Sequence, residues 1–284
     1  MPAPNICACF SAVAAALTLA AFTSAAVALP PAPEGYKWEK QEAFSDEFNG
    51  DELDKFKWRT YHPFWHTGRA PGRFTADTIS VKDGKLQIKN RMLDQPQDGF
   101  TIACGSVTSI SEDAHYGYYE VSMKASSVNL SSTFWFTNRP HYGVHHEIDV
   151  IEAVGGDPKF EVMRLGMKSN THTFTDKGKQ YSQGGSTKLN IPADEAFQRY
   201  GMWWKDANTI DMYYEGEYAF TIHPKTDVSD TPFDRPMFMC LVTETYDWQP
   251  PPTAEDLADD TRNTTYYDWV RAYRLVPVEE KAAD

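Results

Sequence analysis

Short apolar segments recur along most of the chain, and turn-forming residues separate them. In many of these segments apolar and polar residues alternate, which is the period of a β-strand with one packed face and one polar face. A hairpin is predicted over residues 79–90, because Asp83 and Gly84 form a favoured two-residue turn. Further strands are predicted within ten segments: 100–109, 116–126, 132–138, 145–153, 161–174, 199–206, 209–216, 217–223, 236–245 and 266–275.

Helical periodicity is limited to two brief stretches, 194–201 and 253–260. Many short strands with turn residues between them are typical of sandwiches and jelly rolls and do not fit a parallel α/β sheet. The chain is therefore expected to be all-β, with a jelly-roll sandwich of two antiparallel sheets. We expect one domain over residues 36–276, since no repeat or linker interrupts it.

The first 28 residues are interpreted as an export signal. Residues 7–28 are small and apolar and end in Ala-Val-Ala, the form of a signal-peptidase site, although no Lys or Arg precedes them. Residues 29–35 form a proline-rich lead-in, and residues 277–284 form an acidic tail. We expect a secreted, periplasmic or cell-surface protein that has no membrane contact once residues 1–28 are removed, because no other segment could span a bilayer.

Composition narrows the class of partner. A formal net charge of −13 argues against nucleic acid as a partner. Aromatic residues make up 14% of the 284 residues, which suits either a surface that stacks on sugar rings or a β-rich core. After removal of the signal, Cys104 and Cys240 remain, and the sequence leaves open whether they form a disulfide or stay buried free thiols.

Candidate chemistry is concentrated in the strand predicted around residues 145–153. Glu147, Ile148, Asp149 and Val150 alternate in the period of a strand, but strict alternation would then place Glu152 in the core. A buried unpaired carboxylate costs several kcal/mol, on the order of the penalty for a lone buried polar group. A one-residue β-bulge near Val150 and Ile151 avoids that cost and places all three acids on one face.

Three carboxylates on one face suggest acid and base catalysis. Side chains of Glu147 and Glu152 that lean toward each other can reach the separation of about 5 to 5.5 Å that a retaining glycosidase uses. Three carboxylates this close cannot all ionise at neutral pH, so one holds a proton and can act as a general acid. The alternative is a solvated acidic strand that binds nothing, but the apolar residues between the acids require a packed face.

The loop over residues 60–74 carries a second set of candidate residues. Its prolines and glycines predict irregular backbone, and it also contains Trp65 and Arg69. An exposed aromatic ring and a forked cation can bind a sugar face and an anionic group. Alternatively, Trp65 packs down and the loop is only structural.

The motif Glu-apolar-Asp-x-x-Glu at 147–152, with SDEFNG at 45–50 and YYDWVRAYR at 266–274, resembles glycoside hydrolase family 16. The resemblance implies a jelly roll with an open substrate cleft on its concave face and a retaining double displacement. It also implies that Glu147 is the nucleophile, Glu152 the acid/base and Asp149 the helper between them. No cofactor is expected for catalysis.

Within that family, the chain is similar to the β-agarases and β-porphyranases, which cleave red-algal galactans. The similar stretches are KDGKLQI, SSTFWFTN, DVIEAVGG, MKSNTHTF and TETYDWQPPP. The resemblance implies that Trp135, His172, Glu244 and Trp248 contact the sugar. Alternatively, Trp135 is a core residue and His172 a polar residue on a wet face.

The choice between porphyran and agarose depends on charge, since porphyran carries sulfate and agarose is neutral. Arg presented in a cleft is the natural ligand for sulfate, so Arg69 and Arg139 favour porphyran. Alternatively, both only pair with carboxylates of this acidic chain. We therefore expect an endo-acting hydrolase of β-1,4 galactosidic bonds that prefers porphyran. The alternatives are a β-agarase, a laminarinase, a κ-carrageenase or an inactive galactan-binding jelly roll, the last being disfavoured by three crowded acids.

The family resemblance also implies a structural calcium ion on the convex side, with Gly84 and Asp268 among its ligands. Calcium requires six or more oxygen ligands, and the remaining ones cannot be read from the sequence. The expected partner is the polysaccharide substrate, and a monomer is expected.

Overall fold

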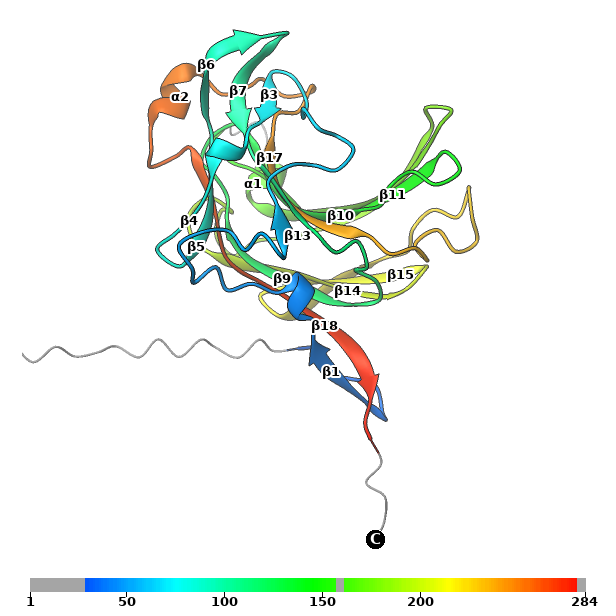
Figure 1. Ribbon diagram of the computed structural model, residues 1–284. Coiled ribbons are helices and arrows are strands. Elements are labelled where there is room, and N and C mark those ends of the chain that lie inside the picture. Colours follow the sequence, from blue (N-terminus) through cyan, green and yellow to red (C-terminus); the bar gives the residue numbers. More distant parts are fainter. Residues whose placement is uncertain (1–28, 157–160, 280–284) are drawn as a thin grey trace, which may run out of the picture.

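The computed structural model describes residues 29–156 and 161–279, and the predicted signal peptide and most of the acidic tail lie outside them. Two large antiparallel sheets stack on each other (Figure 1), which confirms the predicted jelly-roll sandwich. The larger sheet runs in the order β16 (Glu217–Ile222), β15 (Thr209–Tyr214), β14 (Gln198–Asp206), β9 (Gly117–Lys124), β18 (Thr264–Pro277), β5 (Lys85–Lys89) and β4 (Ile79–Lys82), and β1 (Tyr36–Lys40) also pairs with β18.

The second sheet carries the predicted catalytic strand. Its order is β13 (Gln180–Lys188), β12 (Gly166–Thr175), β11 (Val144–Val154), β10 (Ser131–Thr137), β17 (Phe238–Glu244), β8 (Ser106–Ser109) and β2 (Trp58–Arg59). A small third sheet of β3 (Gly72–Phe74), β7 (Phe100–Cys104) and β6 (Arg91–Gln97) stands over one end of it (Figure 1). The two short 3-10 helices are η1 (Glu42–Phe44) and η2 (Ala76–Thr78).

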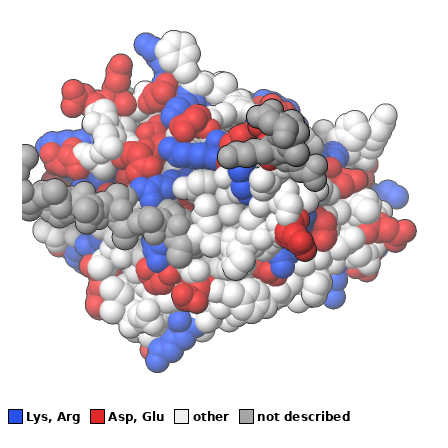
Figure 2. Space-filling model, turned by 90° about the horizontal axis from the view of Figure 1, so that it is seen from below, with Lys and Arg blue, Asp and Glu red and all other residues white. Residues whose placement is uncertain are grey.

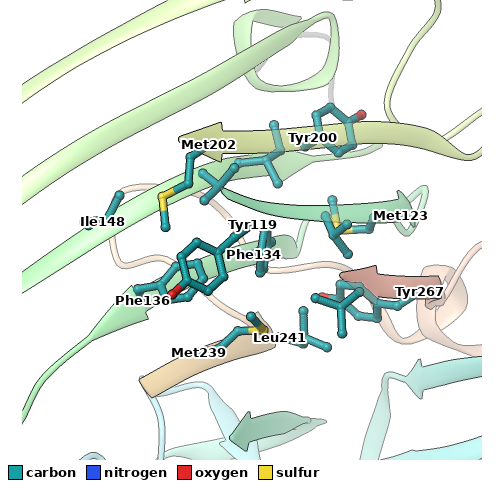
Figure 3. Close-up of a cluster of buried hydrophobic side chains, with 14 of the residues drawn as sticks. Tyr119, Met123, Phe134, Phe136, Ile148, Tyr200, Met202, Met239, Leu241 and Tyr267 are labelled. Atoms are coloured by element: carbon teal, nitrogen blue, oxygen red, sulfur yellow. The ribbon is translucent and has the colours of Figure 1, made fainter. Parts of the chain in front are cut away.

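The core lies between the two large sheets. Tyr119 and Met202 from the larger sheet meet Phe134 and Phe136 from the second sheet (Figure 3), and all four are fully buried. Alternation along β10 explains this, because Phe134 and Phe136 face the core while the residues between them face the opposite side of the sheet. The face of the second sheet that is turned away from the core is therefore available for a site.

Part of that outer face is covered by a second apolar cluster. Trp135, Phe238 and Cys240 from β10 and β17 pack there against Phe74 and Cys104 from the small sheet. Cys104 and Cys240 are both buried free thiols, so no disulfide joins them. The remainder of the face, toward β11 and β12, stays open.

Some of the elements predicted from local sequence patterns are confirmed, and others are wrong. The hairpin of β4 and β5 is confirmed, and Asp83 and Gly84 both have positive φ, as its turn requires. The helix predicted over 253–260 is confirmed as α2 (Ala254–Ala258), which begins with a capping box.

The helix predicted over residues 194–201 is wrong. Residues 198–206 form β14, which is paired on both sides by β9 and β15, and Tyr200 is fully buried there. Pairing with distant strands outweighs the weak helical pattern of this stretch. Conversely, residues predicted as the start of a strand at 161–174 form the short helix α1 (Glu161–Arg164).

Within residues 29–156 and 161–279, no helix is long and apolar enough to cross a membrane. Viewed from below, on the outer side of the larger sheet, acidic and basic side chains are interspersed around a broad uncharged area (Figure 2).

Gly155, directly after β11, gives the first testable prediction. A Cβ at this position would lie 2.0 Å from the backbone oxygen of Ser126, so Gly155→Ala forces two backbone segments apart. Overpacking of this kind costs about 1 to 3 kcal/mol, which corresponds to a fall in Tm of roughly 3 to 10 °C for a domain of this size. Thermal unfolding of Gly155→Ala measures it, with Gly50→Ala as the control, since a Cβ at Gly50 meets nothing closer than 3.5 Å. Equal Tm values for the two variants would contradict the close approach.

Candidate active site

Strand β11 contains the predicted bulge. In the pairing of β10 with β11, Phe134 lies opposite Ile151 and Trp135 lies opposite Asp149, so Val150 has no opposite partner. Ile148, Val150 and Ile151 all pack in the core between the sheets. The prediction of a one-residue bulge near Val150 and Ile151 is confirmed.

The bulge places the three acids on the same face of the second sheet. Glu147, Asp149 and Glu152 lie opposite Thr137, Trp135 and Thr133, which alternate along β10 and so share one face. All three acids line a single cavity of about 680 Å³. Its full lining is Trp65, Arg69, Thr133, Trp135, Glu147, Asp149, Glu152, Met163, Lys168, Asn170, His172, Phe174, Gln180, Glu244, Tyr246, Asp247 and Trp248.

His172 from β12 joins the acid cluster. It pairs opposite Glu147, and one ligand atom each from Glu147, Asp149 and His172 lie within 4.8 Å of one another. His172 Nε2 lies 3.1 Å from Asp149 Oδ2, while Gln180 Nε2 lies 2.9 Å from His172 Nδ1. Nδ1 of the same ring also lies 2.6 Å from Ser182 Oγ, so the imidazole is held between strand β13 and the acid cluster.

Burial and mutual repulsion disfavour full ionisation of the cluster. Burial, and next the charge of Asp149, raise the pKa of Glu147 well above its usual range, although His172 opposes the shift. Burial, and next the charges of Glu152 and Glu244, likewise raise the pKa of Asp149. The cluster therefore holds a proton at neutral pH, as expected for carboxylates at this spacing.

Glu152 is held by two hydrogen bonds that the sequence did not predict. Asn170 Nδ2 donates to Glu152 Oε2 at 2.5 Å, and the Tyr246 hydroxyl donates to Glu152 Oε1 at 2.9 Å. The sequence did contain a signal that Asn170 faces the site. Asn170 lies two residues before His172 in the same strand, so strand alternation places both side chains on one face of the sheet. Tyr246 lies in a turn after β17, where strand periodicity gives no orientation.

Arg69 lies in the cavity wall between two aromatic rings. Its guanidinium carbon is 5.5 Å from the ring centre of Trp65 and 5.6 Å from that of Tyr246. Its Nε lies 3.7 Å from Glu244 Oε2, and its Nη1 lies 3.3 Å from Asp247 Oδ1. A half-exposed cation stacked between rings in a cleft can bind an anionic or hydroxyl group of a ligand.

Glu244 is a buried carboxyl at the end of β17. Burial raises the pKa of Glu244 to about 8, and the charge of Glu152 adds to that effect, while Arg69 opposes it. Oε2 of Glu244 has no hydrogen-bond partner within the described residues. In its neutral form this group can donate a hydrogen bond into the cavity.

Two tryptophans, predicted to contact sugar, line the cavity in different environments. Trp135 is buried and stacks on His62, with ring centres 5.4 Å apart. Trp248 is 53% exposed and stacks on Tyr246, with ring centres 4.8 Å apart. Trp135 is therefore a buried residue, which was the alternative considered for it, and it also lines the cavity. Trp248 lines the same cavity from the exposed end of the segment after β17.

Arg139 does not line this cavity. It lies just beyond β10 and forms two hydrogen bonds of 2.9 Å with Glu112, one from Nε and one from Nη2. It borders a separate depression of about 300 Å³, together with Asn138, His141 and Arg235. The pairing with a carboxylate matches the alternative considered for Arg139, and its role in substrate binding stays a prediction.

The predicted calcium ligands lie on the larger sheet, away from the acid cluster. Gly84 is in the turn between β4 and β5, where a Cβ would lie 3.5 Å from Asn49 Oδ1, and burial raises the pKa of Asp268 in β18. The half-buried Asp268 carboxyl and the Asn49 amide oxygen are hard oxygen donors, which suit calcium. Among the described residues, the one cluster of three metal-ligating side chains is Glu147, Asp149 and His172.

A jelly roll whose bulged strand presents paired carboxylates in a cleft on the outer face of one sheet defines a glycoside hydrolase. Comparison with known proteins identifies the family. Residues 38–275 match the model described as β-porphyranase A–D, glycoside hydrolase family 16 domain, and the chain belongs to that family.

Three relatives illustrate the similarity. The chain is 52% identical to β-porphyranase E of Zobellia galactanivorans, with 87% of this chain and 92% of the relative covered. A crystal structure of a β-porphyranase from the human gut bacterium Bacteroides plebeius superimposes with a TM-score of 0.83 at 45% identity, covering 89% and 97% of the two chains. An extracellular agarase of Streptomyces coelicolor is 30% identical, with 87% of each chain covered.

The pKa of Glu244 predicts a pH-dependent effect on stability. In the unfolded chain a glutamate ionises near pH 4.5, whereas in the folded protein Glu244 stays neutral until about pH 8. Its contribution to stability is therefore fully present below about pH 4.5 and is lost as the pH rises from about 4.5 to 8. Glu244→Gln cannot ionise, so we expect its Tm relative to the unsubstituted protein to rise steadily from pH 5 to pH 8.

Differential scanning calorimetry at pH 5, 6.5 and 8 measures this effect. Asp247→Asn is the matched control, because it also removes one negative charge beside Arg69, but from an exposed side chain. Parallel Tm curves for Glu244→Gln and the unsubstituted protein would show that Glu244 is ionised throughout.

Proposed function

We propose that the protein is a secreted, endo-acting, retaining hydrolase that cleaves β-1,4 galactosidic bonds in porphyran in preference to agarose. One observation carries the proposal: a bulged strand gathers Glu147, Asp149 and Glu152 in a cleft whose wall contains Arg69. The three acids supply the chemistry of glycoside cleavage, and Arg69 supplies a cation for a sulfated sugar. The greater identity to a β-porphyranase than to an agarase supports the same substrate.

The reaction proceeds in two displacements. In the first, the Glu147 carboxylate attacks the anomeric carbon while Glu152 donates its proton to the departing glycosidic oxygen. In the second, Glu152 takes a proton from water, and the resulting hydroxide displaces Glu147 from the sugar. Two inversions retain the anomeric configuration, and fresh products examined by proton NMR test that outcome.

Asp149 supports the nucleophile by holding a proton between the two glutamates. Its raised pKa favours the neutral form, in which it can donate to Glu147 and leave that carboxylate ionised. His172 Nε2 lies 3.1 Å from Asp149 Oδ2 from the neighbouring strand, so the imidazole packs directly against this carboxyl group. We assign Asp149 the helper role on this arrangement.

Substrate recognition uses the cavity wall. Trp248 offers a ring face to a sugar, and Arg69, held between Trp65 and Tyr246, offers its guanidinium to a sulfate. An incoming sulfate would compete with Glu244 and Asp247 for Arg69, and the neutral form of Glu244 makes that exchange easier. Agarose, which lacks sulfate, offers only hydroxyl groups to Arg69 and so gains less from it.

The remaining expectations are proposals of the same kind. Export through residues 1–28 suits an enzyme whose substrate is an external polysaccharide. A structural calcium ion held by Gly84 and Asp268 would stabilise the larger sheet without contacting the cleft, and a lower Tm in the presence of a chelator tests it. A monomer is proposed, and its mass in solution tests that proposal.

Substitution of the two glutamates is the direct test of the mechanism. Glu147→Gln removes the nucleophile and Glu152→Gln removes the proton donor, so each should lower kcat on porphyran by about 10³-fold or more. Both changes are nearly isosteric, so both variants should keep the fold and still unfold cooperatively. Reducing-sugar release and thermal unfolding measure the two effects, and full turnover in purified Glu147→Gln would refute the assignment.

Substitution of Arg69 tests the substrate. Arg69→Ala should lower kcat/KM on porphyran by roughly 10- to 100-fold, the value of one charge-assisted contact, and change the value on agarose by less than about threefold. Arg274→Ala is the control, since Arg274 pairs with Glu39 on the larger sheet. An equal loss on both polysaccharides would count against a sulfate contact.

A further inference from the structure

Glu152 has both carboxyl oxygens engaged by protein donors. Asn170 Nδ2 reaches Oε2 at 2.5 Å and the Tyr246 hydroxyl reaches Oε1 at 2.9 Å. A group that must give up a proton in one step and recover it in the next needs partners that tolerate both of its states. The two donors differ in this respect, because an amide nitrogen only donates whereas a phenol can donate or accept.

The ring of Tyr246 is held rigidly. It stacks on Trp248 with an angle of 17° between the rings, and it packs in a small apolar cluster with Val154 and Met163. Burial, followed by the charges of Glu152 and Glu244, raises the pKa of Tyr246 well above its usual range. The hydroxyl therefore keeps its proton at every working pH and remains able to donate to Glu152.

Asn170 is held equally firmly from the other side. It sits in the middle of β12, opposite Asp149 on β11 and opposite Gly184 on β13. A Cβ at Gly184 would lie 2.1 Å from Asn170 Oδ1, so only glycine leaves room for the amide at this position. The amide oxygen is confined by this approach, and the amide nitrogen is left facing Glu152.

We propose that Tyr246 and Asn170 are positioning residues that fix the orientation of Glu152 and set the pH range over which it acts as an acid. This inference rests on the acid/base role proposed for Glu152. In the ionised state both partners donate to the carboxylate. In the protonated state Asn170 still donates to Oε2, while the Tyr246 hydroxyl turns and its oxygen accepts a hydrogen bond from Oε1–H.

Removal of the Tyr246 hydroxyl isolates this role. Tyr246→Phe keeps the ring that stacks on Trp248, so KM should change by less than about twofold, while kcat falls roughly 10-fold because Glu152 is no longer oriented. One donor to the carboxylate is lost, which favours the protonated form of Glu152. The alkaline limb of the kcat profile should therefore move to higher pH by about half a unit or more.

The control is Tyr218→Phe. The Tyr218 hydroxyl contacts Thr221 within β16, a strand of the larger sheet that lies far from the cleft. It should leave kcat, KM and the pH profile unchanged. A loss of kcat in Tyr246→Phe without movement of the alkaline limb would indicate a merely structural role and overturn the proposal.

A second measurement does not depend on the substrate. The side-chain carboxyl carbon of Glu152, assigned by its absence from the NMR spectrum of Glu152→Gln, is titrated in the unsubstituted protein and in Tyr246→Phe. We expect a higher midpoint in Tyr246→Phe, and identical midpoints would overturn the proposal. If the midpoints differ but the unsubstituted protein does not hydrolyse porphyran, the hydrogen-bond inference stands and the proposed substrate fails.

Discussion

One unpaired residue, Val150, governs the arrangement of the whole site. Without it, the alternation of β11 would place Glu152 between the sheets, where a lone carboxylate has no partner. Because Val150 is bulged, Val150 and Ile151 both pack in the core, and the alternation shifts by one residue. Glu152 then lies on the same face of the sheet as Glu147. The bulge in β11 thus creates the arrangement of the three acids, and the two large sheets hold that bulge in place.

The site concentrates charge at a cost in free energy. Asp149 and Glu244 are buried and Glu147 is partly buried, all three in the cavity that Glu152 lines, and desolvation is the largest cause of the raised pKa in each of these three. Such groups lower stability when they ionise, so their retention is better explained by function than by folding. Arg69 is the cation in the cavity wall nearest to Glu244, and its side chain is partly exposed to solvent.

The sequence predicted those features that depend on local pattern. Alternation broken at Glu152 indicated the bulge, Asp83 and Gly84 indicated a hairpin, and brief helical periodicity over residues 253–260 indicated α2. It failed where distant strands decide the outcome. The helix and strand predicted over 194–201 and 199–206 overlapped, and the strand is the correct one because β9 and β15 pair with residues 198–206. Tyr246 reaches Glu152 through a turn whose direction no periodicity encodes, and the pairing of Arg139 with Glu112 joins positions 27 residues apart.

The two free thiols have a practical consequence. Cys104 and Cys240 lie in one apolar cluster that joins the small sheet to the second sheet, and both are completely enclosed. The small sheet is therefore attached by packing and by hydrogen bonds, such as that from Gly72 N–H to Thr245 Oγ1 at 3.0 Å, and not by a disulfide between these two cysteines. Reductants have no covalent link to break between these residues, so this part of the protein can assemble equally well in a bacterial cytosol used for overexpression and in an oxidising exterior.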